Sequence, residues 1–197
     1  AYPIEIEVDV ASGLPAVAVV GLPDTAIRES KERVKSAIKN SGYKYPSERI
    51  IINLAPADIK KEGPSFDLAI ALGVLAATNQ INPEWLSNYI ILGELALNGE
   101  IRPVKGALPI AIYMQKTRKN KLILPKENAS EAAVVEDIEV YPVRNLVEAV
   151  GFISGDIPIK AYKINIEELL KGISNYEIDF SDVKGQYLAK RALEIAA

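Results

Sequence analysis

The sequence predicts an α/β fold with a mixed sheet, and three features of the chain support this prediction. Apolar residues alternate with acidic ones from Ile4 to Val10, which is the period of a half-buried strand. Short β-branched runs then alternate with longer apolar segments that are typical of core helices. Turn residues separate these segments, as at Gly21-Leu22-Pro23 and Asn98-Gly99. A chain of 197 residues is long enough to bury one sizeable core.

The first half of the chain is expected to hold three strands and two helices. The strands are an alternating run, a fully apolar run and a β-branched run. The first helix begins at the capping residue Asp24 and ends before Gly42, which stands where a positive φ is commonly needed. The second is an apolar core helix. In chain order, these elements are strands at 4–10 and 16–20, a helix at 24–41, a strand at 49–54 and a helix at 68–77.

The second half of the chain predicts a hairpin followed by alternating helices and strands. Asn98-Gly99 between two apolar runs is the strongest two-residue hairpin signal. The later apolar segments again alternate between strand and helix length. In chain order, these elements are strands at 89–97 and 100–104, a helix at 106–115, a strand at 122–125, a helix at 129–135, a strand at 138–143 and a helix at 145–153.

We expect the apolar residues of these elements to surround one mixed sheet in a domain that spans residues 1–155. Residues 156–178 are interpreted as a linker with a short helix at 166–170, and 179–197 as the start of a further module with a helix from Tyr187. The chain starts without methionine and stops within a helical pattern, so a piece of a longer protein is expected. The predicted core residues are Leu54, Leu68, Ile70, Leu72, Val74, Leu75, Ile91, Leu92, Leu108 and Ile112.

A polar loop joins the β-branched strand to the core helix at 68–77. The loop turns at Gly63-Pro64 and offers Ser65 or Asp67 as the N-cap of the helix. Such a loop can be an ordinary capped connection. It can also present a serine hydroxyl beside free backbone N–H groups, as a nucleophile requires.

Composition excludes several functional classes. The chain has no cysteine and no histidine, which removes disulfides, thiolate nucleophiles, structural zinc sites and His-based triads. We expect no metal site. A net charge of −3 argues against binding nucleic acid with the whole surface. No apolar run has the length of a membrane span and no signal-peptide pattern is seen, so the cytoplasm is the expected location.

Two sets of basic residues leave room for local contacts. On the outer face of the helix at 24–41, pairs such as Glu29–Arg33 favour a solvated face, with DNA contact as the alternative. Four cations near the end of the helix at 106–115 are explained by the helix dipole and solubility, with an anion or nucleic acid as the alternative. These cations are Lys116, Arg118, Lys119 and Lys121.

Several blocks of sequence resemble the N-terminal region of the magnesium-chelatase-like AAA+ ATPases of the YifB and ComM family. The resemblance covers nearly the whole chain and implies a Lon-protease-like fold for residues 1–155. It also implies that 179–197 leads into an AAA+ module. The intact protein would then use ATP and Mg²⁺, assemble as a homo-hexamer and, in ComM members, act in DNA branch migration during transformation. The blocks are Val20–Asp24, Glu29–Val34, Asn53–Asp58 and Phe66–Ala71.

The same resemblance places residues 182–186 near the adenine in such ATPases. Val183, Gly185 and Gln186 would then form part of an adenine pocket. The phosphate-binding motif G-x-x-x-x-G-K-[ST] occurs nowhere in the 197 residues. We therefore expect no bound ATP or Mg²⁺ in this chain by itself.

Comparison with Lon proteases places Ser65 at the nucleophile, because Lys61-Glu62-Gly63-Pro64-Ser65 matches the Lon motif. Without gaps, the position of the Lon lysine is occupied by Leu108. Leucine cannot take a proton from a serine hydroxyl, so the Ser-Lys dyad is broken. Lys105, three residues earlier, is the alternative as a displaced base. Phe66 stands where Lon has a small residue and is expected to crowd the substrate site.

These observations favour a non-catalytic accessory domain of a magnesium-chelatase-like ATPase. Two alternatives remain, a Lon-like serine peptidase that uses Lys105 and a chelatase-type domain that binds a partner protein. The missing lysine separates the first interpretation from the peptidase. The small net negative charge of the chain is compatible with either DNA or a protein as partner.

Overall fold

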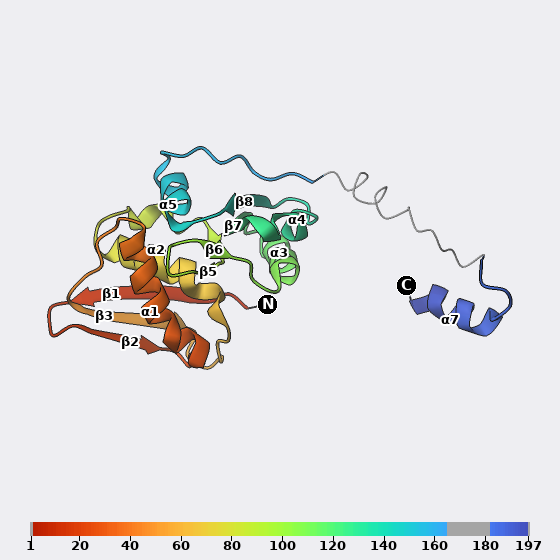
Figure 1. Ribbon diagram of the computed structural model, residues 1–197, viewed down its shortest axis with the longest axis horizontal. Helices are drawn as coiled ribbons and strands as arrows, with labels where there is room; N and C mark the ends of the chain where they lie inside the picture. Colours follow the sequence, from red (N-terminus) through yellow and green to blue (C-terminus); the bar gives the residue numbers. More distant parts are fainter. Residues whose placement is uncertain (1, 165–181, 197) are drawn as a thin grey trace. The chain divides into compact units, whose positions relative to one another are not determined.

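The computed structural model describes residues 2–164 and 182–196 (Figure 1). The chain divides into two compact units, Ala1–Lys163 and Ile164–Ala197. The predicted boundary at 155 falls inside the first unit, while the short helix predicted at 166–170 lies outside the described residues. The division into domain, linker and module stays a prediction. Within the described ranges, no helix is long and apolar enough to cross a membrane.

The first sheet is mixed and has the order β1-β3-β2. Its central strand pairs antiparallel with β1 and parallel with β2. The central position explains why Ile50, Ile52 and Leu54 are buried, whereas the acidic residues of β1 alternate outward. The strands are β1 (Glu5–Ala11), β2 (Ala16–Val20) and β3 (Arg49–Ala55).

Two helices complete the first layer of the core. Asp24 caps α1 (Thr25–Asn40). The buried face of this helix carries Ile27, Val34 and Ile38. The helix α2 (Asp67–Ala77) is apolar on nearly every side and packs against both β1 and α1. Figure 1 shows α1 lying across the first sheet. The expectation for residues 1–77 is confirmed in element order.

A second sheet, β4-β7-β8, is entirely parallel. Two helices bury alanines against one face of this sheet, and a third packs against β8. The strands are β4 (Ile90–Ile91), β7 (Lys121–Pro125) and β8 (Glu139–Val143). The helices are α3 (Ala107–Lys116), α4 (Ala129–Ala132) and α5 (Leu146–Ser154).

The hairpin around Asn98-Gly99 forms, but its strands are much shorter than predicted. Only β5 (Glu94–Leu95) and β6 (Ile101–Arg102) pair, as a separate two-stranded sheet. The predicted strand at 89–97 is broken because Gly93 leaves the line of β4: its N–H donates to the carbonyl of Ser65, and its carbonyl accepts from Leu68. The α/β class is confirmed, whereas the expectation of one sheet is wrong.

The core largely matches the prediction. Seven of the ten predicted residues are buried: Leu54, Leu68, Ile70, Leu72, Val74, Leu75 and Leu92. Ile91 and Leu108 are half-buried. The prediction for Ile112 is wrong, since its side chain is 38% exposed. The face of α3 that packs inward carries Ala107, Ala111 and Met114, so Ile112 points away from it.

Three short 3₁₀ helices and one further α-helix complete the described residues. The 3₁₀ helices are η1 (Pro64–Phe66), η2 (Pro83–Trp85) and η3 (Lys126–Asn128). In the second unit, α7 (Tyr187–Ala196) confirms the helix predicted from Tyr187. Its apolar residues Leu188, Leu193 and Ile195 are exposed.

Candidate functional site

The Gly-Pro-Ser loop places Ser65 in η1, directly before α2. Gly63 has φ 84° and ψ 167°, a backbone region that is essentially restricted to glycine. Ser65 is half-buried, and its carbonyl accepts the N–H of Gly93 at 2.9 Å. The expected capping role is wrong for Ser65 and for Asp67: Phe66 occupies the N-cap of α2, and no side chain caps that end.

One carboxylate ties this loop to the start of α1. Asp24 Oδ1 accepts the N–H of Ile27 at 2.8 Å, while Asp24 Oδ2 accepts the N–H of Gly63 at 2.9 Å. The backbone of Lys61 adds two bonds, from its N–H to Leu22 and from the Asp24 N–H to its carbonyl. The loop before Ser65 is therefore fixed by side-chain and backbone bonds.

Lys61 is the least expected residue of the loop, because its side chain is buried. The residue is only 2% exposed, and its Nζ donates to the carbonyl of Pro56. Its neighbour Lys60 instead reaches solvent and pairs with Glu62 at 2.7 Å. A lysine in a polar loop gives no sequence signal of burial, so sequence reasoning missed this residue.

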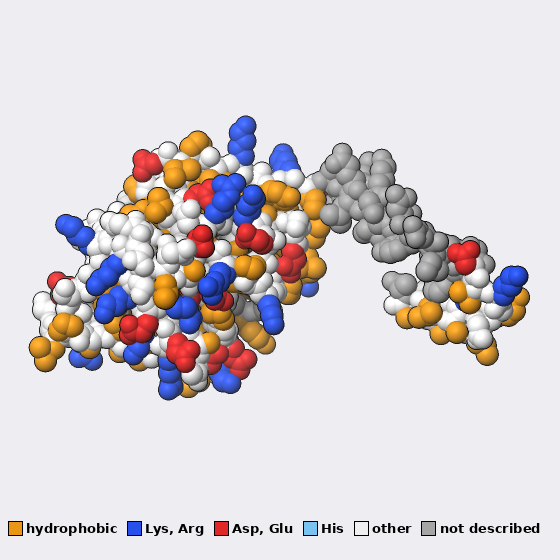
Figure 2. Space-filling view, viewed as in Figure 1, with side chains coloured by type: hydrophobic (Ala, Val, Ile, Leu, Met, Phe, Trp, Pro, Cys, Tyr) orange, Lys and Arg blue, Asp and Glu red, His pale blue; other side chains and the backbone are white. Residues whose placement is uncertain are grey.

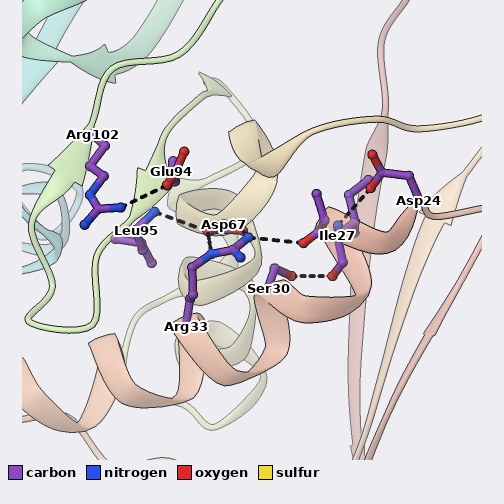
Figure 3. Close-up of polar contacts among 9 residues, drawn as sticks. Asp24, Ile27, Ser30, Arg33, Asp67, Glu94, Leu95 and Arg102 are labelled. Atoms are coloured by element: carbon purple, nitrogen blue, oxygen red, sulfur yellow. Dashed lines mark hydrogen bonds and ion pairs between the residues drawn. The ribbon is translucent and has the colours of Figure 1, made fainter.

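A buried ion pair holds the other end of the loop (Figure 3). Arg33 Nε donates to Asp67 Oδ2 at 2.8 Å and Arg33 Nη2 donates to Asp67 Oδ1 at 3.2 Å. The N–H of Leu95 donates to the same carboxylate at 3.3 Å. Burial raises the pKa of Asp67, and Arg33 opposes that rise. The hydrogen bond to Asp67 raises the pKa of Arg33.

The ion pair corrects the predicted surface pair between Glu29 and Arg33. The guanidinium of Arg33 turns toward Asp67 and the carbonyl of Ala26. A buried carboxylate without a donor is far more costly than an unpaired surface glutamate, which explains the choice of partner. Sequence reasoning missed the pair because 34 residues separate its members.

The structure shows the surroundings of the two residues compared with the Lon base, while the broken dyad itself stays a prediction. Lys105 is exposed and lies in the loop before Gly106, the N-cap of α3. Leu108 is half-buried on α3, where its N–H donates to Glu131 at 3.1 Å. Among the described residues, no amine or carboxylate forms a hydrogen bond with the Ser65 hydroxyl. A serine without a base has its ordinary weak nucleophilicity.

Phe66 is half-buried and packs against the main core. Crowding of a substrate site by its ring stays a prediction.

The residues compared with an adenine site form the turn that precedes α7. Val183 is 42% exposed, and its carbonyl accepts from Lys190 Nζ. Gly185 and Gln186 have φ of 73° and 55°, and Gln186 accepts the Lys190 N–H at 2.9 Å. Contact of this turn with adenine stays a prediction.

ATP and Mg²⁺ do not fit the residues that the structure describes. Triphosphate binding needs backbone amides and a lysine around the phosphates, and oxygen ligands for Mg²⁺. The sequence lacks the phosphate-binding motif, and the described part of the chain holds no group of three or more carboxylates that could bind a metal. The absence of ATP and Mg²⁺ from this chain by itself stays a prediction.

Comparison with known proteins links the chain to one family. The family model described as subunit ChlI of Mg-chelatase matches residues 6–128. The competence protein ComM of Haemophilus influenzae is 42% identical over 196 residues, 98% of this chain and 38% of that protein. The uncharacterized protein YifB of Escherichia coli is 40% identical over 197 residues, 100% of this chain and again 38% of the relative.

A more distant similarity extends to proteases. Lon protease 2 of Bacillus subtilis is 28% identical over 139 residues, which is 70% of this chain and 25% of the protease. This similarity supports the Lon-like fold. The chain thus spans about two fifths of the length of the ComM and YifB relatives.

Proposed function

The chain belongs to the magnesium-chelatase-like family that includes ComM and YifB, and we propose that it is a non-catalytic accessory domain of a longer ATPase. The observation that best supports this proposal is the hydrogen bonding around Ser65. The loop around it is held firmly by Asp24 and by the Arg33–Asp67 pair, yet no described side chain bonds its hydroxyl. A Lon-like position without a base supports a structural role for the loop.

The finer proposal concerns the rest of the protein. ATP and Mg²⁺ would be bound by a part of the longer protein outside these 197 residues, and the protein would assemble as a cytoplasmic homo-hexamer. A relative that is named a competence protein supports a role in transformation, and DNA branch migration is the activity that we propose within that role. Figure 2 shows Lys and Arg side chains interspersed with Asp and Glu on the visible face. The chain has a net charge of −3, so we assign DNA binding to the rest of the protein.

The proposal is tested with the intact protein and a Ser65→Ala variant. ATP hydrolysis is measured with branched DNA, with single-stranded DNA and without DNA. We expect stimulation by branched DNA and the same rates in Ser65→Ala, since the hydroxyl does no chemistry. Ser87→Ala is the matched control, because Ser87 is an exposed serine whose hydroxyl donates only to a backbone carbonyl.

A second assay addresses the peptidase alternative directly. A serine-reactive fluorophosphonate should label the wild-type chain no more than it labels Ser65→Ala. Ser65-dependent labelling, or peptide cleavage lost on substitution of Ser65 or Lys105, would overturn the non-catalytic role. An intact protein whose ATP hydrolysis ignores every form of DNA would overturn the branch-migration part alone.

A further inference from the structure

The carboxyl ends of β7 and β8 form a crevice, because the helices that follow them lie on opposite faces of the sheet. After β7, Ala129 and Ala132 of α4 pack with Leu122 and Leu124. After β8, α5 joins the separate core cluster that contains Ile123 and Val143. Successive side chains of a strand face opposite sides, so the two connections leave the sheet edge in opposite directions. Ligands of open α/β sheets bind where connections diverge in this way.

A cavity of about 350 Å³ occupies this crevice. Its size lies within the range of small-molecule sites. The segment after α5 closes one side, anchored by the Tyr162 N–H, which donates to the carbonyl of Val140 at 2.7 Å. The polar side chains that line the cavity are Lys126, Ser130, Arg144, Glu148, Lys160 and Tyr162.

The charge of the cavity is net positive. Glu148 is already engaged by Arg144, whose backbone N–H donates to it at 2.6 Å and whose Nη1 donates at 3.3 Å. Its charge is therefore largely balanced by that guanidinium. In the part of the chain that the structure describes, neither Lys126 nor Lys160 has an ion-pair partner. Two lysines without an ion-pair partner among the described residues thus line one cavity.

We propose that this crevice binds a small anion that carries a phosphate group. Lys126 and Lys160 supply compact point charges, and Ser130 supplies a hydroxyl that can donate to a phosphate oxygen. Arg144 forms an ion pair with Glu148 and has further N–H groups that can donate to an anion. A free phosphate and a phosphate ester share this chemistry. The inference does not depend on the proposed ATPase function.

The test is an NMR titration of the 197-residue chain with inorganic phosphate, pyrophosphate and ribose 5-phosphate in turn. Saturable shifts of the backbone amides of Lys126, Ser130, Arg144 and Lys160 are expected. Tighter binding of ribose 5-phosphate than of inorganic phosphate would identify an ester as the ligand class. Equal affinity would identify the free anion.

Charge-matched variants separate the crevice from general attraction of anions. Lys126→Gln/Lys160→Gln should weaken pyrophosphate binding by about tenfold or more. Lys44→Gln/Arg49→Gln removes the same charge from two exposed residues outside the cavity and should change it by no more than about twofold. Equal losses in the two variants, or no saturable shift at the crevice up to about 20 mM anion, would overturn the proposal.

Discussion

Replacing Arg33 with methionine is expected to leave a buried carboxylate without its main partner. The Asp67 side chain is 1% exposed, and Arg33 supplies two of the three hydrogen bonds that the structure gives its oxygens. Removing one member of a buried pair costs about 3–5 kcal/mol. The Arg33 side chain is itself 23% exposed, so water can partly replace it. We therefore expect the free energy of unfolding to fall by about 3 kcal/mol.

The loss should depend on pH, and its sign follows from Asp67. Burial raises the pKa of this carboxyl, and the guanidinium opposes the rise, so the Arg33→Met variant has a higher pKa still. In the unfolded chain the pKa is about 4. Between these two values the folded variant holds a proton that the unfolded chain has lost. Its free energy of unfolding therefore rises as pH falls through this window, and the deficit against wild type shrinks.

Urea denaturation at about pH 7 and about pH 5 measures both effects. Lys60→Met is the control, because Lys60 and Glu62 form a solvent-exposed pair whose loss should cost far less than the loss of a buried one. Arg33→Met/Asp67→Asn should recover much of the loss, since asparagine is neutral and still accepts the Leu95 N–H. The reasoning is refuted if Arg33→Met costs no more than the control, or the same at both pH values.

Two further substitutions test the packing, again by urea denaturation. Leu72→Ala, at a fully buried position of α2, should lower the free energy of unfolding by about 2–5 kcal/mol; a loss below about 1 kcal/mol would contradict the assigned core. Gly21→Ala should cost at least about 2 kcal/mol, because its Cβ would lie 2.1 Å from the Leu54 carbonyl oxygen at φ +93°. Gly155→Ala is the control, because Gly155 has φ +82° and a Cβ there would have no neighbour. It should therefore lose only the cost of a left-handed backbone conformation, about 1 kcal/mol. Equal losses in the two glycine variants would contradict the close approach of Gly21 to the Leu54 carbonyl.

The first sheet and its helices could be predicted because their sequence periods are simple. Alternation over β1 and the apolar face of α1 each require one kind of neighbour, and Asp24 and Gly42 mark the helix ends. The strand at 89–97 failed for a different reason. Gly93 bonds Ser65 and Leu68, just before and at the start of α2, with both of its backbone groups, and no local pattern reveals partners so far back in the sequence.

The polar contacts of the site could not be read from sequence for the same reason. Local spacing assigns Arg33 to Glu29, but the choice of partner depends on which carboxylate folding buries. The burial of Lys61 likewise depends on the path of the chain past Pro56. Both contacts become visible only when α1, β3 and α2 are placed together.

The match to a protease motif therefore identified a backbone shape more than a reaction. Gly63 is required by its φ and ψ, and Asp67 is required by a partner on another helix. Each of these needs persists whether or not Ser65 reacts. Catalysis would add one more requirement, a base that reaches the hydroxyl, and the described residues show no hydrogen bond of that kind to Ser65. A loop that joins α1, α2 and β5 through buried polar contacts has sufficient structural reason to keep this sequence without any peptidase activity.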